Sequence, residues 1–150
     1  MATDDAVFID TNVLVYAKLA LSPFHVAAET WLQRLEAQEV ELWIGRQTLR
    51  EYLSAMTRPH TLTEQIPVPA LIQDAHDFME RFHVAEDGGR ATVKLLSLMN
   101  EVPIGGKQVH DANIVATMLV YGIPRLLTHN VDDFKRFAHH VEIIPLVHPQ

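Results

Sequence analysis

Apolar and polar positions change in blocks along the chain, and these blocks predict strands and helices in alternation. Short apolar runs predict strands at residues 7–9, 40–44, 83–86, 125–128 and 141–146. Longer segments with helical spacing predict helices at residues 12–21, 23–38, 46–58, 70–82, 90–102 and 109–122, with a short helical piece at 131–137. Pro59 and the polar loop after it are expected to end the third helix.

Three residues mark expected helix ends. Ser22 is the predicted N-cap of the second helix, and Pro23 is its predicted first residue. Gly122 is the predicted C-terminal cap of the helix at 109–122, because glycine adopts the left-handed conformation that such caps use.

Alternating strands and helices predict an α/β fold with right-handed crossovers. The expected architecture is a three-layer α/β/α sandwich, with a mostly parallel central sheet of about five strands and helices on both faces. Ligands bind such sheets beyond the carboxyl ends of the strands. Asp10 stands at one predicted strand end and Thr128 at another, so their side chains meet if the two strands are neighbours.

Composition restricts the class of protein further. The 150 residues, 48% of them hydrophobic, fit a single domain over 1–150, since no repeat or linker interrupts the chain. No apolar run long enough for a membrane span and no signal peptide are found, and the absence of cysteine suits a cytoplasmic chain. The net charge of -7 excludes nucleic-acid binding through general basicity.

A carboxylate and an amide directly follow the first predicted strand, as Asp10 and Asn12. Carboxylates gathered at the rim of an apolar sheet repel one another, and a divalent cation is the simplest partner for them. Asp, Thr and Asn are also good N-caps for the helix that follows. The tripeptide from Asp10 to Asn12 therefore supports a metal site and a helix cap equally.

Two further acids are candidates for the same site. Asp111 is expected in the first turn of an otherwise apolar helix, where the helix dipole alone would also favour it. Glu51 is expected to point about 200° away from Leu49, which belongs to the core stripe of its helix. Taken alone, Glu51 is better explained as a solvated surface glutamate, since glutamate is seldom buried, and only the other acids make it a candidate.

Four stretches resemble, in order, the motifs of the PIN domain family, and most closely its VapC-type ribonuclease toxins. They are FIDTNVLVY, LREYL, HDANIVAT and LLTHNVDDF. The resemblance implies a few carboxylates that bind one or two Mg²⁺ or Mn²⁺ ions and hydrolyse RNA. It marks Asp10, Glu51 and Asp111 as the core acids, with Asn12 and Thr128 as supporting groups. It also implies a small antitoxin protein as partner and a homodimer.

The chain departs from the family pattern at Asn130, where many PIN domains have an acid. Asn130, Asp132 or Asp133 could complete the metal site. Alternatively, Thr128 or Asn130 caps the short helix at 131–137, and Asp132 and Asp133 are acids of its N-terminal turn. Asp133 lies one helical turn beyond Asn130, whereas Asp132 is expected to point about 100° away. We therefore expect Asn130 and Asp133 in the site, and Arg50, beside Glu51, as the contact to RNA phosphate.

Other functions fit the sequence less well. A zinc site built from the nine histidines lacks an HExxH motif, and the adjacent His139 and His140 would point apart on a regular element. A haloacid-dehalogenase-like phosphatase would need its second acid at Asn12. The remaining alternative is a non-catalytic PIN-like module that binds RNA or protein, and the presence of all three core acids argues against it.

Overall fold

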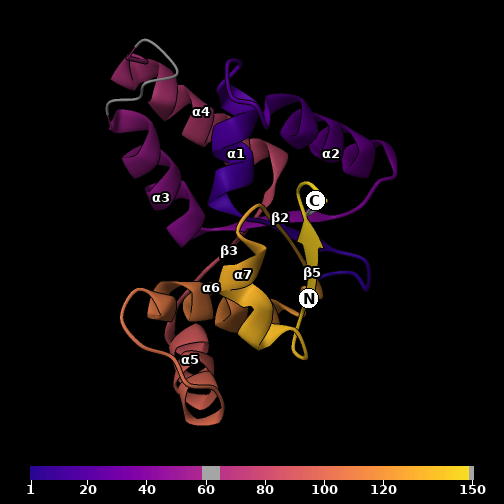
Figure 1. Cartoon of the computed structure of the whole chain (residues 1–150), viewed down its shortest axis with the longest axis vertical. Helices are drawn as coiled ribbons and strands as arrows, with labels where there is room; N and C mark the ends of the chain where they lie inside the picture. Colours follow the sequence, from indigo (N-terminus) through magenta and orange to yellow (C-terminus); the bar gives the residue numbers. More distant parts are fainter. Residues whose placement is uncertain (59–64, 149–150) are drawn as a thin grey trace.

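Five parallel strands form the centre of the computed structural model, which describes residues 1–58 and 65–148 (Figure 1). The strands are β1 (Val7–Ile9), β2 (Leu42–Gly45), β3 (His83–Ala85), β4 (Arg125–Thr128) and β5 (Glu142–Pro145). Their order in the sheet is β3-β2-β1-β4-β5, and every neighbouring pair is parallel. The predicted parallel sheet is confirmed, and β1 and β4 are neighbours as the site prediction requires.

Helices cover both faces of the sheet and complete the predicted three layers (Figure 1). One layer holds α1 (Thr11–Lys18), α2 (His25–Ala37), α3 (Arg46–Thr57) and α4 (Val68–Arg81). The other holds α5 (Gly89–Glu101), α6 (Gln108–Tyr121), α7 (Val131–Phe134) and the 3-10 helix η1 (Lys135–Phe137). Among the described residues, no helix is both long and apolar enough to cross a membrane.

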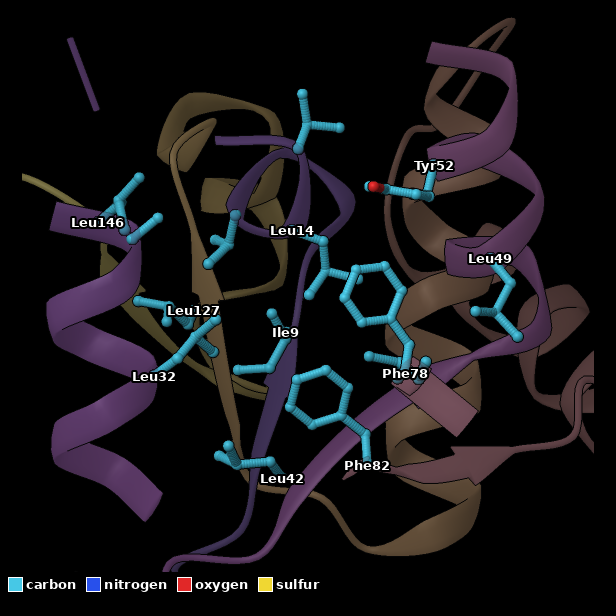
Figure 2. Close-up of a cluster of buried hydrophobic side chains, with 14 of the residues drawn as sticks. Ile9, Leu14, Leu32, Leu42, Leu49, Tyr52, Phe78, Phe82, Leu127 and Leu146 are labelled. Carbon is cyan, nitrogen blue, oxygen red and sulfur yellow. The ribbon is translucent and has the colours of Figure 1, made fainter. Parts of the chain in front are cut away.

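Alternating side chains of the short strands fill two separate cores. Val7 and Ile9 on β1 pack against the layer of α1 to α4, and Phe8 between them packs against the layer of α5 to α7. Figure 2 shows the first core, where Ile9 and Leu127 from neighbouring strands meet side chains from the helices above them. Burial on both faces explains why these strands read as continuous apolar runs.

The predicted helix ends agree in part. Gly122 caps α6 in the left-handed conformation with φ 72°, as predicted. The prediction for α2 is wrong, because its N-cap is Phe24 and it begins at His25. Ser22 instead begins a turn before the helix, where its Oγ accepts a hydrogen bond from the Phe24 N–H at 3.1 Å. The predicted role of Pro59 lies outside the described residues.

The register of β1 and β4 places their polar ends side by side. Ile9 pairs with Leu127, and the next N–H, that of Asp10, donates to the Leu127 carbonyl at 3.0 Å. Asp10 and Thr128 therefore lie together at the carboxyl edge of the sheet, where α1 begins.

Candidate active site

Asp10 is a buried carboxylate at the end of β1, with 6% of its surface exposed. Its Oδ1 accepts a hydrogen bond of 2.8 Å from the Thr11 N–H, so the cap that the sequence suggested does form. Its Oδ2 accepts from the Thr128 hydroxyl at 2.7 Å and from the Asn12 amide at 3.1 Å. Burial and, to a smaller extent, the negative charge of Glu51 together raise the pKa of Asp10 to about 6, although these hydrogen bonds act to lower it.

Thr128 and Asn12 hold Asp10 in one orientation. The Thr128 hydroxyl, which donates to Asp10, accepts from the backbone N–H of Asn130 at 3.0 Å. The Asn12 side chain donates to Asp10 and accepts from the backbone N–H of His129 at 3.1 Å. Both predicted supporting residues therefore connect the Asp10 carboxylate to the loop after β4.

Glu51 faces the start of α1 and is half-buried. One of its oxygens accepts from the Thr11 hydroxyl at 2.9 Å, and the other accepts from the Gln47 amide at 2.6 Å. The description of Glu51 as a solvated surface glutamate is therefore wrong. Its carboxylate is held beside the first turn of α1, close to Asp10.

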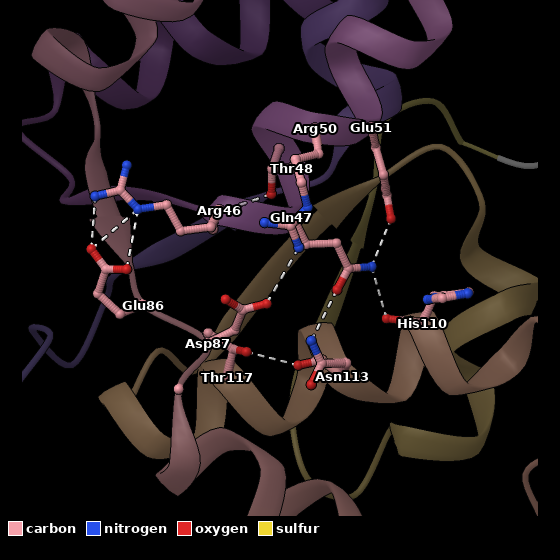
Figure 3. Close-up of polar contacts among 12 residues, drawn as sticks. Arg46, Gln47, Thr48, Arg50, Glu51, Glu86, Asp87, His110, Asn113 and Thr117 are labelled. Carbon is pink, nitrogen blue, oxygen red and sulfur yellow. Dashed lines mark hydrogen bonds and ion pairs between the residues drawn. The ribbon is translucent and has the colours of Figure 1, made fainter.

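Gln47 joins α3 to α6 and was not identified from the sequence (Figure 3). Its amide nitrogen donates to Glu51 and also to the His110 carbonyl, at 3.1 Å. Its amide oxygen accepts from the Asn113 side chain at 3.0 Å. Because His110 and Asn113 flank Asp111 in the sequence, Gln47 fixes Glu51 relative to the helix that carries Asp111. The spacing of four residues between Gln47 and Glu51 is the signal that could have identified it.

Asp111 is half-buried in the first turn of α6. Desolvation, together with the charges of Asp133, Asp10 and Glu51, raises the pKa of Asp111 to about 6. Its side chain makes no hydrogen bond or ion pair with any described residue. The carboxylates from four separate elements thus act on one another electrostatically, although they lie far apart in the sequence.

Asp10, Glu51 and Asp111 border one open hollow of about 400 Å³. Five of the predicted site residues line it: Asp10, Asn12, Glu51, Asp111 and Asn130. Carboxylate and amide oxygens are the ligands that Mg²⁺ and Mn²⁺ prefer, and a cation would relieve the repulsion that raises both pKa values. The residues present therefore fit a divalent metal ion.

The remaining predicted residues lie around this hollow. Asp133 borders a neighbouring hollow together with Asn130 and Asp132, yet its charge reaches Asp111. Asp132 is highly exposed and pairs with Lys135 at 2.5 Å. Arg50 is exposed, pairs with Asp87 at 3.6 Å, and borders a third hollow beside Gln47 and Glu51 (Figure 3).

Sequence analysis also missed Arg58 and Tyr16, both of which line the hollow of the acids. Arg58 lies seven residues after Glu51, which places it on the same side of the α3 axis. Among the described residues that line this hollow, Arg58 is the one lysine or arginine. The seven-residue spacing between Glu51 and Arg58 is the signal in the sequence that could have identified Arg58.

Known proteins resemble this chain over most of its length. The family model described as PIN domain matches residues 7–140. Ribonuclease VapC48 from Mycobacterium tuberculosis (strain ATCC 25618 / H37Rv) is 28% identical over 130 residues, which are 85% of this chain and 89% of that protein.

Solved structures share the fold at lower sequence identity. VapBC2 from Rickettsia felis, bound to a DNA fragment from its promoter, superimposes with a TM-score of 0.68 and 18% identity, over 93% of this chain and 98% of that one. VapC20 from Mycobacterium tuberculosis, described as a Sarcin-Ricin loop cleaving toxin, superimposes with a TM-score of 0.60 and 17% identity. The match covers 81% of this chain and 87% of that one.

Proposed function

The chain belongs to the PIN domain family, and we propose that it is a metal-dependent endoribonuclease, the toxin of a VapBC-type toxin–antitoxin pair. The observation that supports the activity most strongly is the meeting of Asp10, Glu51 and Asp111 around one hollow. Their carboxylates come from the end of β1, the middle of α3 and the first turn of α6, and those of Asp10 and Asp111 have pKa values raised to about 6. Such a group of mutually repelling acids is the arrangement that a divalent cation stabilises.

Each residue of the site has a distinct part in this proposal. Asp10, Glu51 and Asp111 would hold Mg²⁺ or Mn²⁺ through their carboxylates, and Asn130 and Asp133 would complete the set of ligands. Bound metal supplies an activated water for attack on phosphorus and neutralises charge on the scissile phosphate.

The groups that support the ligands act through position. Thr128 and Asn12 keep the second oxygen of Asp10 in place, and Thr11 and Gln47 keep Glu51 in place. These contacts fix the acids before any ion binds, which lowers the cost of assembling the site.

The chain would hold RNA beside the acids through a small number of local contacts. Arg58 is best placed to bind a phosphate, because it lines the hollow of the acids and has no acidic partner among the described residues. Arg50 would bind a more distant phosphate, after release from Asp87. Tyr16 also lines the hollow, and its ring packs against Phe24 and His129 with centroid distances of 5.1 and 5.4 Å. The part of the ring that borders the hollow would contact an unpaired base.

We further propose an antitoxin partner, a homodimer and a cytoplasmic location, with residues 1–150 as one domain. The support is the likeness to chains solved as VapBC complexes, such as the one from Rickettsia felis.

Metal-dependent cleavage separates this proposal from a non-catalytic RNA-binding module. Purified protein is incubated with defined tRNA and rRNA fragments in Mg²⁺, in Mn²⁺ or in chelator, and the products are resolved on a sequencing gel. We expect discrete cuts with either metal and none with chelator. Binding of the fragments without any metal-dependent cut would support the binding module instead.

A further inference from the structure

Glu101, His139 and His140 form a cluster outside the hollow of the acids. Glu101 is the last residue of α5, and the two histidines lie in the turn between η1 and β5. Their ring centroids are 4.8 Å apart, so the divergence expected on a regular element does not apply to this turn. Adjacent side chains can converge here because a turn does not impose the side-chain directions of a helix or strand.

The cluster has the geometry of a set of metal ligands. One ligand atom from each residue lies within 4.8 Å of the other two. The His140 Nε2 is 3.2 Å from a Glu101 oxygen, yet this buried nitrogen has no hydrogen-bond partner among the described residues. A buried polar atom without a hydrogen bond requires an explanation, and a bound ion is one of the usual ones.

We propose that Glu101, His139 and His140 bind a zinc-class transition-metal ion. Two imidazoles and one carboxylate form a known three-ligand set for Zn²⁺, with water in the fourth position, whereas Mg²⁺ prefers oxygen ligands. A tetrahedral ion brings its ligand atoms to about 3.4 Å from one another. Glu101 and His139 are exposed, so side-chain rotations can close the remaining distance.

Binding at this cluster would join two parts of the chain that are distant in sequence. Figure 1 shows α5 at one end of the molecule, beside α6, while the turn leads into β5 at the edge of the sheet. A shared ion would tie the end of α5 to this turn and would stabilise the folded chain by mass action. This stabilisation would be independent of RNA cleavage.

Zinc titration by isothermal calorimetry tests the proposal on the full chain purified without a polyhistidine tag. We expect one high-affinity zinc site whose affinity falls about tenfold or more in His139→Ala and in Glu101→Gln. Both residues are exposed, so these variants retain the fold. His76→Ala, which removes an exposed histidine of α4, is the matched control and should bind zinc like the wild type.

A second variant distinguishes this cluster from the hollow of the acids. Asp111→Asn should keep the high-affinity zinc site, because Asp111 does not belong to the cluster. Zinc should also raise the melting temperature of wild type and Asp111→Asn but not that of His139→Ala. Loss of the zinc site in Asp111→Asn with retention in His139→Ala would overturn the proposal, as would unchanged affinity in both cluster variants.

Discussion

Replacing Asp10 with asparagine should stabilise the metal-free protein, because the fold holds this charge in an unfavourable place. Burial, followed by the charge of Glu51, raises the pKa of Asp10 from 3.8 to about 6. At about 1.4 kcal/mol per pKa unit, the ionised carboxylate lowers the free energy of unfolding by about 3 kcal/mol at neutral pH. The Asp10→Asn variant removes this penalty.

Hydrogen bonding reduces the expected gain. The Asp10 oxygens accept three hydrogen bonds, and an asparagine offers a single acceptor oxygen in their place. The asparagine NH₂ group would face a donor that the second Asp10 oxygen now accepts from, and the loss of that hydrogen bond costs about 1 kcal/mol. The net gain in the free energy of unfolding is then about 2 kcal/mol. For a chain of this size, that gain corresponds to a rise of about 4–8 °C in melting temperature.

The pH dependence of this gain identifies its cause. Between about pH 4 and about pH 6 the unfolded chain loses the Asp10 proton before the folded chain does, so the metal-free wild type loses stability as pH rises. Asparagine has no such proton, and the advantage of Asp10→Asn should therefore grow across this window and level off above it.

Thermal unfolding followed by circular dichroism in chelator, at about pH 4.5 and about pH 7.5, measures this difference. Asp4→Asn, an exposed aspartate near the N-terminus, serves as the matched control and should show little change at either pH. Added Mg²⁺ should stabilise the wild type more than Asp10→Asn. An equal difference between wild type and variant at both pH values would refute the explanation.

Three further predictions concern the other ligands. Glu51→Gln should weaken Mn²⁺ binding and RNA cleavage by about an order of magnitude or more, because hard cations prefer a carboxylate to an amide; unchanged Mn²⁺ titration would leave Glu51 a purely structural role. Asp133→Asn should reduce the cleavage rate more than Asp132→Asn, since the charge of Asp133 reaches Asp111 while Asp132 pairs with Lys135; the reverse order would exclude Asp133. Asn130→Asp should keep cleavage and raise the affinity for a second Mn²⁺ ion, as measured by calorimetry, and a loss of cleavage would show that the amide is required.

The sequence predicted the sheet and one edge of the site well, for identifiable physical reasons. β1 and β4 are buried on both faces, so continuous apolar runs in the sequence identify them as strands. Each run ends abruptly in polar residues. Parallel pairing then brings Asp10 and Thr128 together without any further information. The start of α2 was less predictable, because the Ser22 hydroxyl serves equally well in a turn.

Other features depend on distances between elements that no local pattern encodes. Glu51 looked solvated because helical periodicity describes one helix alone, whereas its contact with Thr11 depends on how α3 crosses α1. The bond from Gln47 to Asn113 likewise depends on how α3 lies against α6. The convergence of His139 and His140 arises from an irregular turn, where periodicity predicts nothing.

The cleavage rate of one RNA fragment in Mg²⁺, measured side by side for wild type, Asp10→Asn, Asp111→Asn and Asp4→Asn, tests the shared carboxylate site most directly. All four proteins are first shown to be folded by circular dichroism. We expect Asp4→Asn to cleave like the wild type, and both site variants to lose cleavage by about two orders of magnitude or more. Cleavage at the wild-type rate by folded Asp10→Asn or Asp111→Asn would contradict a single metal site formed by these acids.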